Sequence, residues 1–416
     1  MLSVKNPIMT GFFPDPSICR VGNKFYTVHS TFAYFPGVPV FESEDLVHWN
    51  LISNVLDRDS QVPLSGCQHS QGIFAPTIRY HKGTWYMITT NVSDQGNFIV
   101  TAKDPRGPWS EPYYLGESTG GIDPSLFFDD DGTCYYIGQR PRSAGYRYNG
   151  DCEIWIQTLD LDTMQLKPDA TIVLTGFQRK AIWPEGPHLY KKDGYYYILH
   201  AESGTSIHHS VMIARSKNVF GPYEYCPCNP ILTHRHLGAQ YPVTCVGHAD
   251  LVDDGNGNWY MVVLACRPNQ GYTLLGRETF LAKVTWEDGW PVVNAGVGHL
   301  EEVVTLPYEG QPSDDVPQCK TYTFDTPSLP LELLTLRNHR DHELELHAEE
   351  HIVRLFHRCD SLKDCGEPAY LALRQQHWNC EFETSFIPHF CKESDCAGIA
   401  MVQSNENHLR AECYPQ

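Results

Sequence analysis

Short apolar runs with the period of β-strands recur between residues 13 and 265, and long amphipathic helical patterns are nearly absent. Five of these runs are rich in aromatic and β-branched residues: KFYTVHS, TWYMITT, CYYIGQ, YYYILHA and WYMVVLA. Each run follows a turn signal, at Gly22-Asn23, Lys82-Gly83, Asp131-Gly132, Asp193-Gly194 and Gly257-Asn258. A polar pair of this kind between two apolar runs is typical of a β-hairpin. The pattern therefore predicts an all-β chain.

The five hairpins belong to five copies of one longer repeat. The copies are FPDPSICRVGNKFYTVHS, FAPTIRYHKGTWYMITT, IDPSLFFDDDGTCYYIG, PEGPHLYKKDGYYYILHA and GHADLVDDGNGNWYMVVLA. Their spacing is close to that of one four-stranded blade, which predicts a radially repeated β architecture. The opening of each copy places one residue at an equivalent point of the ring, so Asp15, Asp123, Glu185 and His248 are expected to converge near its axis.

The character of the sequence changes near residue 308. A Pro-, Gly- and acid-rich stretch predicts a linker at 308–319, which separates a first domain at 1–307 from a second at 320–416. Shorter alternating runs between Leu331 and Gln403 predict an antiparallel β-domain. A sandwich normally needs about 100 residues and seven strands, so we expect this second domain to be an incomplete β-sandwich.

Composition narrows the class of partner. The formal net charge is -19 and aromatic residues make up 12% of the chain. An acidic surface repels nucleic acid and anionic membranes and suits a neutral ligand, although a solvated acidic surface is also the ordinary state of a soluble protein. The N-terminus lacks the apolar segment of a secretory signal, which predicts a cytoplasmic protein. The 15 cysteines have irregular spacing, which favours free thiols over a zinc site.

Three carboxyl groups open repeats in unusual settings. Asp15 and Asp123 share the motif Asp-Pro-Ser. Either could cap a turn, but two copies at equivalent positions favour a role in a site. Glu185 lies between prolines and glycine, where Asp or Asn is the usual turn residue, and the neighbouring Trp183 would raise its pKa. Inverting glycoside hydrolysis needs two facing carboxyl groups roughly 6.5–9.5 Å apart, which separate repeats can supply.

Two further residues are candidates for the same pocket. His248 could be a structural histidine, but its position in the fifth repeat favours the pocket. Arg277 could form a surface ion pair with Glu278 or hold a sugar hydroxyl. The acidic loops at 129–132 and 253–258 lack the full calcium-loop pattern and are better interpreted as hairpin turns.

Together, FPDPSICRVGNKFYTVHSTFAYFPGVPVFESEDLVHW, GIFAPTIRYH, IDPSLFFDDDG, EGPHLYKKDGYYY, GHADLV and LGRETFLAKVTWEDGWP resemble glycoside hydrolase family 43. The resemblance runs from about Asn6 to Trp290 and is greatest to the β-xylosidase and α-L-arabinofuranosidase branch. It implies a five-bladed β-propeller followed by a β-sandwich and an inverting mechanism. By the same resemblance, Asp15 is the general base, Glu185 the general acid and Asp123 the residue that tunes and orients the acid. The residues expected to bind substrate are Phe32, Phe74, His248 and Arg277.

Some positions depart from the family pattern. Phe74 stands where tryptophan is common, Ala33-Tyr34 where an acid-Trp pair is common, and Ser203 where glycine is usual. These positions bear on substrate choice rather than on the chemistry.

The resemblance requires no cofactor. Some family members carry calcium near the equivalent of His248, which leaves a structural Ca²⁺ there open. The expected function is release of terminal xylose or arabinose from xylan- or arabinan-derived oligosaccharides, with no nucleic-acid or membrane partner. A catalytically impaired sugar-binding propeller and an endo-acting arabinanase remain as alternatives, and the chain could be a monomer or a homo-oligomer.

Overall fold

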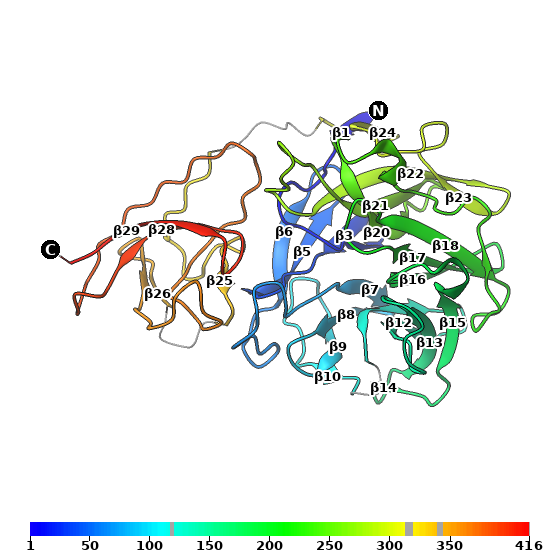
Figure 1. Cartoon of the computed structure of the whole chain (residues 1–416), viewed down its shortest axis with the longest axis horizontal. Coiled ribbons are helices and arrows are strands. Elements are labelled where there is room, and N and C mark those ends of the chain that lie inside the picture. The colour runs from blue at the N-terminus through cyan, green and yellow to red at the C-terminus, as the bar shows by residue number, and fades with distance from the viewer. Residues whose placement is uncertain (117–119, 313–318, 339–343, 416) are drawn as a thin grey trace.

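The computed structural model describes residues 1–116, 120–312, 319–338 and 344–415. These residues form β-strands and two short 3-10 turns, η1 (Phe177–Arg179) and η2 (Arg235–Leu237), and they contain no α-helix. Figure 1 shows a large lobe that holds the N-terminus and a smaller lobe, orange to red, that ends at the C-terminus. The all-β prediction is confirmed. No helix in the described ranges is long and apolar enough to span a membrane.

The large lobe is a ring of five antiparallel sheets, the five-bladed propeller that the resemblance implies (Figure 1). Blade 1 has β2 (Ser17–Val21), β3 (Lys24–Val28), β5 (Gly37–Ser43) and β6 (Asn50–Leu56). Blade 2 has β7 (Thr77–His81), β8 (Thr84–Asn91), β9 (Gly96–Ala102) and β10 (Tyr113–Tyr114). Blade 3 has β11 (Ile122–Phe128), β12 (Cys134–Pro141), β13 (Cys152–Asp160), β14 (Gln165–Leu166) and β15 (Thr171–Thr175). Blade 4 has β16 (Glu185–Lys192), β17 (Tyr195–Glu202), β18 (Ser210–Ser216) and β19 (Glu224–Tyr225). Blade 5 has β20 (Thr244–Asp253), β21 (Trp259–Cys266), β22 (Glu278–Glu287) and β23 (Trp290–Val293).

Each sequence repeat forms the two innermost strands of one blade. The predicted turn pairs lie between these strands in all five blades, from Gly22-Asn23 in blade 1 to Gly257-Asn258 in blade 5. Two similar segments, 104–115 and 217–232, each contain Gly-Pro followed by an aromatic residue, and they supply β10 and β19, the outermost strands of their blades. The repeat therefore encodes the inner hairpin, and the hairpin begins at the axis of the ring.

The core consists of five apolar clusters, one between each pair of neighbouring blades. Successive side chains of a strand point to opposite faces, so the aromatic pair of each repeat contributes to two clusters. In blade 2, Trp85 packs toward blade 1 and Tyr86 packs toward blade 3. In blade 3, Tyr136 packs toward blade 2 and Tyr135 toward blade 4. The aromatic pairs thus join the blades to each other.

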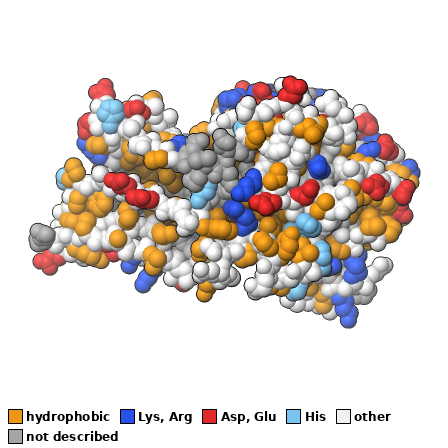
Figure 2. All heavy atoms as spheres, turned by 90° about the horizontal axis from the view of Figure 1, so that it is seen from above, with side chains coloured by type: hydrophobic (Ala, Val, Ile, Leu, Met, Phe, Trp, Pro, Cys, Tyr) orange, Lys and Arg blue, Asp and Glu red, His pale blue; other side chains and the backbone are white. Residues whose placement is uncertain are grey.

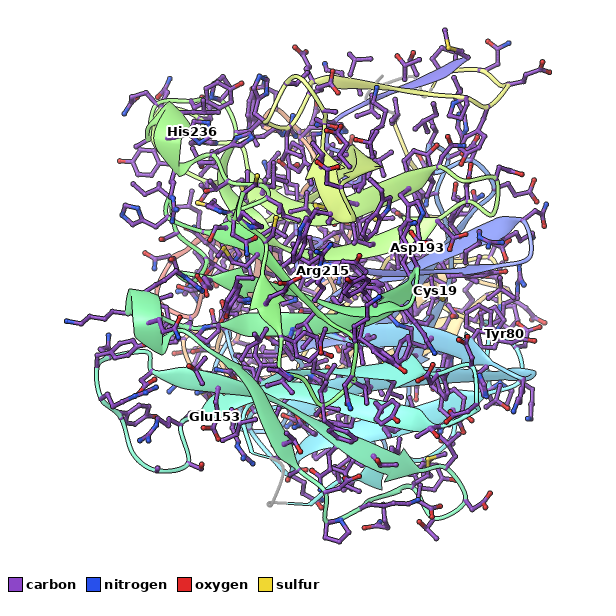
Figure 3. The ribbon with its side chains drawn as sticks, turned by 90° about the vertical axis from the view of Figure 1, so that its right-hand side faces the viewer. Cys19, Tyr80, Glu153, Asp193, Arg215 and His236 are labelled. Carbon is purple, nitrogen blue, oxygen red and sulfur yellow. The ribbon has the colours of Figure 1, made fainter. Side chains whose placement is uncertain are left out.

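Two further contacts complete the ring. Strand β1 (Leu2–Lys5) pairs antiparallel with β24 (Val303–Leu306), and Leu2 is opposite Leu306. This pairing ties the N-terminus to the chain that leaves blade 5. Figure 3 labels Arg215 of β18. Its guanidinium carbon lies 4.1 Å from the centroid of the Trp290 ring of blade 5.

The smaller lobe contains short strand pairs in its described residues. Strand β25 (Thr335–Leu336) pairs with β4 (Tyr34–Phe35) of the propeller, β26 (Leu344–His347) pairs with β27 (Ile352–Leu355), and β28 (Ala397–Val402) pairs with β29 (His408–Cys413). The alternating runs at 369–376 and 380–388 were expected to be strands, and this expectation is wrong because they form no ladder there. Alternation alone does not make a strand where no neighbouring strand satisfies its backbone. Part of the predicted linker, 313–318, lies outside the described residues.

The smaller lobe has an apolar surface over much of its described part, as the left side of Figure 2 shows. Ile387 is 83% exposed and Leu409 is 74% exposed. The lobe is nevertheless attached to the propeller through Arg337, which is fully buried. The Arg337 side chain donates to the carbonyl oxygens of Cys67 (2.6 Å) and Gly366 (2.7 Å).

Candidate active site

Three of the predicted residues share an unusual backbone conformation, a positive φ, which sets the direction of their side chains. Asp15, Asp123 and His248 all have positive φ, at 52°, 55° and 51°. The ladders of β11 and β20 change register at Asp123 and His248, which makes these residues β-bulges. A positive φ is uncommon for residues other than glycine. Its repetition at one point of three blades indicates that the fold holds these side chains in place for a site.

Glu185 is not at the position that the repeats predicted, and this corrects the expected equivalence. In the ladders, Glu185 of blade 4 corresponds to Ile122 of blade 3, and His188 corresponds to Ser125. The bulge position of blade 4 is therefore Gly186, with φ +57°. The sequence alignment of the repeats missed this because Glu185 and the two aspartates are all acidic residues beside proline.

The Asp15 carboxylate is buried and surrounded by donors. Arg277 donates to Oδ1 at 2.7 Å, Ser30 donates to Oδ2 at 2.6 Å, and the His248 Nδ1 lies 3.7 Å from Oδ1. Burial raises the pKa of this carboxyl, but Arg277, His248 and Ser30 outweigh it, so the Asp15 pKa lies below its usual value. Asp15 is therefore ionised at neutral pH.

The pKa values of the other two carboxyl groups, Asp123 and Glu185, are raised instead of lowered. Burial raises the pKa of Asp123 to about 6, even though the Gly186 N–H donates to its Oδ2 at 3.0 Å. Burial, with the negative charges of Asp123 and Asp15, raises the pKa of Glu185 well above its usual value. Among the described residues, none donates a hydrogen bond to the Glu185 side chain. One site thus contains a carboxyl group whose pKa is lowered, Asp15, and one whose pKa is raised, Glu185.

Phe32 and Phe74, two more of the predicted residues, complete the site around Asp15. The Gly186 backbone passes so near His248 that a Cβ at Gly186 would lie 3.0 Å from the imidazole ring. Arg277 lies over the Phe32 ring, with its guanidinium carbon 5.3 Å from the ring centroid. Phe32 in turn contacts Phe74, with 5.3 Å between ring centroids. The structure therefore brings together all seven residues predicted for the site.

The sequence analysis missed three residues of this site. Phe12 stacks on Phe32 at 5.6 Å between ring centroids, Ser30 binds Asp15, and His209 is buried behind Gly247. Phe12 adjoins the first repeat and is a detectable signal. Ser30 and His209 lie at strand or loop positions that no local pattern distinguishes.

A pocket of about 560 Å³ opens next to Trp183, and one of its lining residues, Cys152, lies close enough to Glu185 for the Glu185 charge to raise the Cys152 pKa. Its wall includes Ile122, Gln139, Tyr146, Tyr148, Cys152 and Trp183. Trp183 is 39% exposed. Its ring is closely packed, because a Cβ at Gly204 would collide with the ring and a Cβ at Gly150 would collide with the residue before Trp183. An exposed, fixed aromatic ring next to a carboxyl group is a suitable surface for a sugar.

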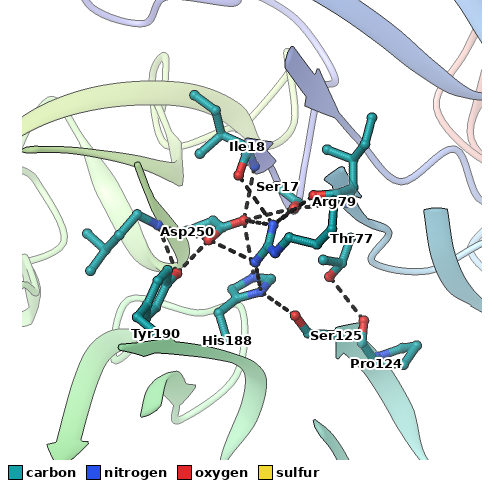
Figure 4. Close-up of polar contacts among 11 residues, drawn as sticks. Ser17, Ile18, Thr77, Arg79, Pro124, Ser125, His188, Tyr190 and Asp250 are labelled. Carbon is teal, nitrogen blue, oxygen red and sulfur yellow. Dashed lines mark hydrogen bonds and ion pairs between the residues drawn. The ribbon is translucent and has the colours of Figure 1, made fainter. Parts of the chain in front are cut away.

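The calcium ion that the resemblance left open near His248 stays a prediction. Calcium takes roughly six to eight oxygen ligands. Within the described ranges, no group of three or more His, Cys, Asp or Glu side chains is placed to hold a metal ion. The charged group on the propeller axis is the Arg79 guanidinium, which binds Asp250 at 3.0 Å (Figure 4).

Two family models match the sequence. Residues 4–291 match the model for glycosyl hydrolases family 43. Residues 321–414 match the model for the β-xylosidase C-terminal concanavalin A-like domain, a β-sandwich.

Individual proteins are similar over nearly the whole chain. A xylosidase/arabinosidase of Butyrivibrio fibrisolvens is 55% identical over 98% of this chain and 79% of its own length. A non-reducing end α-L-arabinofuranosidase of Bacteroides ovatus is 40% identical over 97% of this chain and 74% of its own length. Among solved structures, the xylan β-1,4-xylosidase from Bacillus halodurans C-125 superposes with a TM-score of 0.87 at 36% identity, covering 98% of this chain and 79% of that one.

Proposed function

Because the chain belongs to glycoside hydrolase family 43, we propose that it is an inverting exo-glycosidase that releases terminal xylose or arabinose from xylan- or arabinan-derived oligosaccharides. The feature that carries the proposal is one site in which Arg277 and Ser30 bind Asp15 and lower its pKa, while burial and the charges of Asp123 and Asp15 raise the pKa of Glu185. Single-displacement hydrolysis needs one ionised and one protonated carboxyl group on opposite sides of the sugar.

Asp15 acts as the general base. Its carboxylate is ionised and is held by Arg277 and Ser30, so a water molecule between it and the sugar would find an acceptor of fixed orientation. The base takes a proton from this water as the water oxygen attacks the anomeric carbon. The bond to the leaving group breaks in the same step, which inverts the configuration.

Glu185 acts as the general acid. Burial and the charges of Asp123 and Asp15 raise its pKa well above the usual value, which favours the protonated form that an acid needs. The proton goes to the glycosidic oxygen as the bond breaks. Asp123 assists because its charge raises the pKa of Glu185, while its hydrogen bond from the Gly186 N–H holds the turn that carries the acid.

The pocket next to Trp183 is on the leaving-group side of this reaction, since the acid must reach the glycosidic oxygen. Trp183 and Tyr146 give it exposed aromatic surface for the rest of an oligosaccharide. Phe12, Phe32 and Phe74 form the wall beside Asp15, where the terminal sugar would lie. The names of the similar proteins, xylosidase/arabinosidase and non-reducing end arabinofuranosidase, support terminal pentoses as substrates.

The decisive experiment measures hydrolysis of nitrophenyl β-xyloside and nitrophenyl α-L-arabinofuranoside in parallel. Proton NMR during the first turnovers then reports the anomer released. The proposal requires hydrolysis of at least one substrate, with α-xylose released first from a β-xyloside. First release of β-xylose would mean retention and would make one carboxylate a nucleophile. Sugar binding without hydrolysis would identify a sugar-binding propeller instead.

A further inference from the structure

A second ring of residues lies directly below the catalytic residues. Two positions after each bulge, or after the equivalent position in blades 1 and 2, the chain carries a polar side chain: Ser17, Thr77, Ser125, His188 and Asp250. Their side chains, with those of Arg79 and Tyr190, meet at the propeller axis, and we call these seven residues the axial network (Figure 4). The network thus draws on the inner strand of every blade, whereas the catalytic carboxyl groups come from three.

Arg79 is the centre of the axial network. Its guanidinium donates to Asp250 Oδ2 at 3.0 Å, to Ser17 Oγ at 3.2 Å and to His188 Nδ1 at 3.1 Å. It also donates to the carbonyl oxygen of Ile18 at 3.3 Å. A single side chain from blade 2 therefore binds the inner strands of blades 1, 4 and 5.

Asp250 of blade 5 also binds the inner strands of other blades. It has no exposed surface, and it accepts hydrogen bonds from Ser17 Oγ (2.8 Å), the Ile18 N–H (3.0 Å) and the Tyr190 hydroxyl (2.5 Å). Burial raises the pKa of Asp250, but the Arg79 charge and the hydrogen bonds from Tyr190 and Arg79 outweigh it and hold the pKa well below its usual value. Arg79 and Asp250 thus form an ion pair in which Asp250 is fully buried and the Arg79 side chain is 14% exposed.

Blade 3 joins the network through His188. Ser125 Oγ lies 3.0 Å from His188 Nδ1, which also accepts from Arg79. Because Nδ1 accepts, the ring is neutral with its proton on Nε2, and burial lowers the pKa of His188 to about 3. Ser125 is two residues from Asp123, and His188 is three residues from Glu185. This contact therefore links the strands that carry Asp123 and Glu185.

We propose that Arg79 and Asp250 are positioning residues that set the spacing of Asp15, Asp123 and Glu185 by holding the starts of their strands together. The inference rests on the proposed function. Two residues of strand span only about 7 Å, and the intervening Pro16 and Pro124 stiffen the chain. A shift at Ser17 or Ser125 is thus passed on to the carboxylate. An error of about 1 Å in the placement of reacting groups can cost roughly 10²-fold in rate.

The test compares Arg79→Lys, Asp250→Asn and Ser125→Ala with the wild-type enzyme. Lysine keeps the charge of Arg79 but cannot bind three strands at once. Arg79→Lys and Asp250→Asn should lower kcat about 10²-fold, with KM nearly unchanged because no network residue lines the substrate pocket. Ser125→Ala removes a single hydroxyl and should give a smaller fall in kcat.

Arg20→Lys is the matched control. Arg20 lies on β2 and binds Asp253 of β20, so it too joins two blades, 1 and 5. It lies at the ends of these strands that are far from the catalytic residues. It should leave kcat unchanged.

The pH profile separates positioning from stability. The groups that act on the Glu185 proton are Asp123, Asp15 and Arg277, with Cys152 nearby. Wider spacing weakens the effect of the two aspartates, so the basic limb of kcat/KM should move to lower pH in Arg79→Lys and Ser125→Ala. A residue that only stabilises the fold would lower the melting temperature and leave the profile of the folded enzyme unchanged.

The results are decisive in each case. If Arg79→Lys folds, an unchanged kcat and an unmoved basic limb would overturn the positioning role. If the other variants do not fold, the same result in Ser125→Ala would overturn it. A wild-type enzyme without activity on any pentoside would instead overturn the proposed function, a result that no network variant can produce.

Discussion

Asp15 and Glu185 have the same functional group in one pocket, yet their surroundings shift their pKa values in opposite directions. Asp15 has a guanidinium, an imidazole and a hydroxyl within reach of its oxygens. Glu185 faces two negative charges. The free enzyme should therefore lose activity at low pH as Asp15 gains a proton and at high pH as Glu185 loses one.

Glu185→Gln would remove the proposed proton donor. Turnover of natural oligosaccharides should fall by about 10²–10⁴-fold, and turnover of nitrophenyl glycosides should fall less, because an activated leaving group needs little protonation. Asp15→Asn is the comparison, since loss of the base affects both substrate types. The measurement is kcat/KM on both; equal losses in Glu185→Gln would remove Glu185 from the acid role.

Asp123→Asn should affect pH dependence and stability together. Without the Asp123 charge, the pKa of Glu185 falls, so the basic limb of the pH–rate profile moves to lower pH. Burial raises the folded-state pKa of Asp123 to about 6, so its ionisation penalises the folded state increasingly as pH rises from about 4 to 6. Removing that penalty should raise the free energy of unfolding at pH 7 by roughly 1–3 kcal/mol. Chemical denaturation at pH 7 and pH 4 tests this, and an equal change at both values would contradict it.

At the scale of the element, the important feature is the bulge at the start of the inner strand in blades 3, 4 and 5. In blades 3 and 5 it carries Asp123 and His248, and in blade 4 it is Gly186. Blade 4 places its functional side chain one residue earlier, so Glu185 and Asp123 differ in position along their strands. The offset lets two adjacent blades present two carboxyl groups without placing them at the same height.

Gly186→Ala tests the bulge. The new methyl group would lie 3.0 Å from the His248 ring at a φ of +57°, so it should displace His248 and lower kcat by at least tenfold. Gly194→Ala is the matched control, since Gly194 also has positive φ, at +74°, but meets only the end of Lys217 at 3.9 Å. Both variants should lose about 1 kcal/mol of stability from backbone strain. Equal activity in the two would show that the close approach to His248 has no catalytic effect.

At the scale of the whole molecule, the interblade clusters and the axial network hold the ring from two directions. The clusters bury the faces of the blades, and the network binds their inner edges. The smaller lobe is joined to this ring chiefly at blade 1, where Asn338 donates to the Val62 carbonyl oxygen at 2.9 Å and accepts from the Leu64 N–H at 2.6 Å.

Arg337→Ala tests this attachment. Loss of the hydrogen bonds from a buried guanidinium to Cys67 and Gly366 should weaken the attachment by roughly 3 kcal/mol. Limited proteolysis should then cut the region after residue 344 faster, while the propeller stays resistant. Arg354→Ala, an exposed arginine of the β26–β27 hairpin, is the control. Equal cleavage rates in the two variants would show that Arg337 does not hold the lobe.

The sequence by itself determined the all-β class, the five inner hairpins and the family, because turn residues, alternation and long ordered motifs are local signals. It also identified the three carboxyl groups and four neighbours that the fold brings together. It did not give the strands of the smaller lobe correctly, since strand formation depends on a partner that alternation does not specify.

Only the tertiary structure decided the offset of Glu185, the role of Gly186 at the bulge and the contacts of Ser30 and His209. It alone placed Arg79 at the axis, where residues separated by up to 233 positions share one buried network. The physical reason is that pKa values and positions depend on which charges and donors lie within a few ångströms. Those neighbours come from different blades, and their proximity is a property of the closed ring.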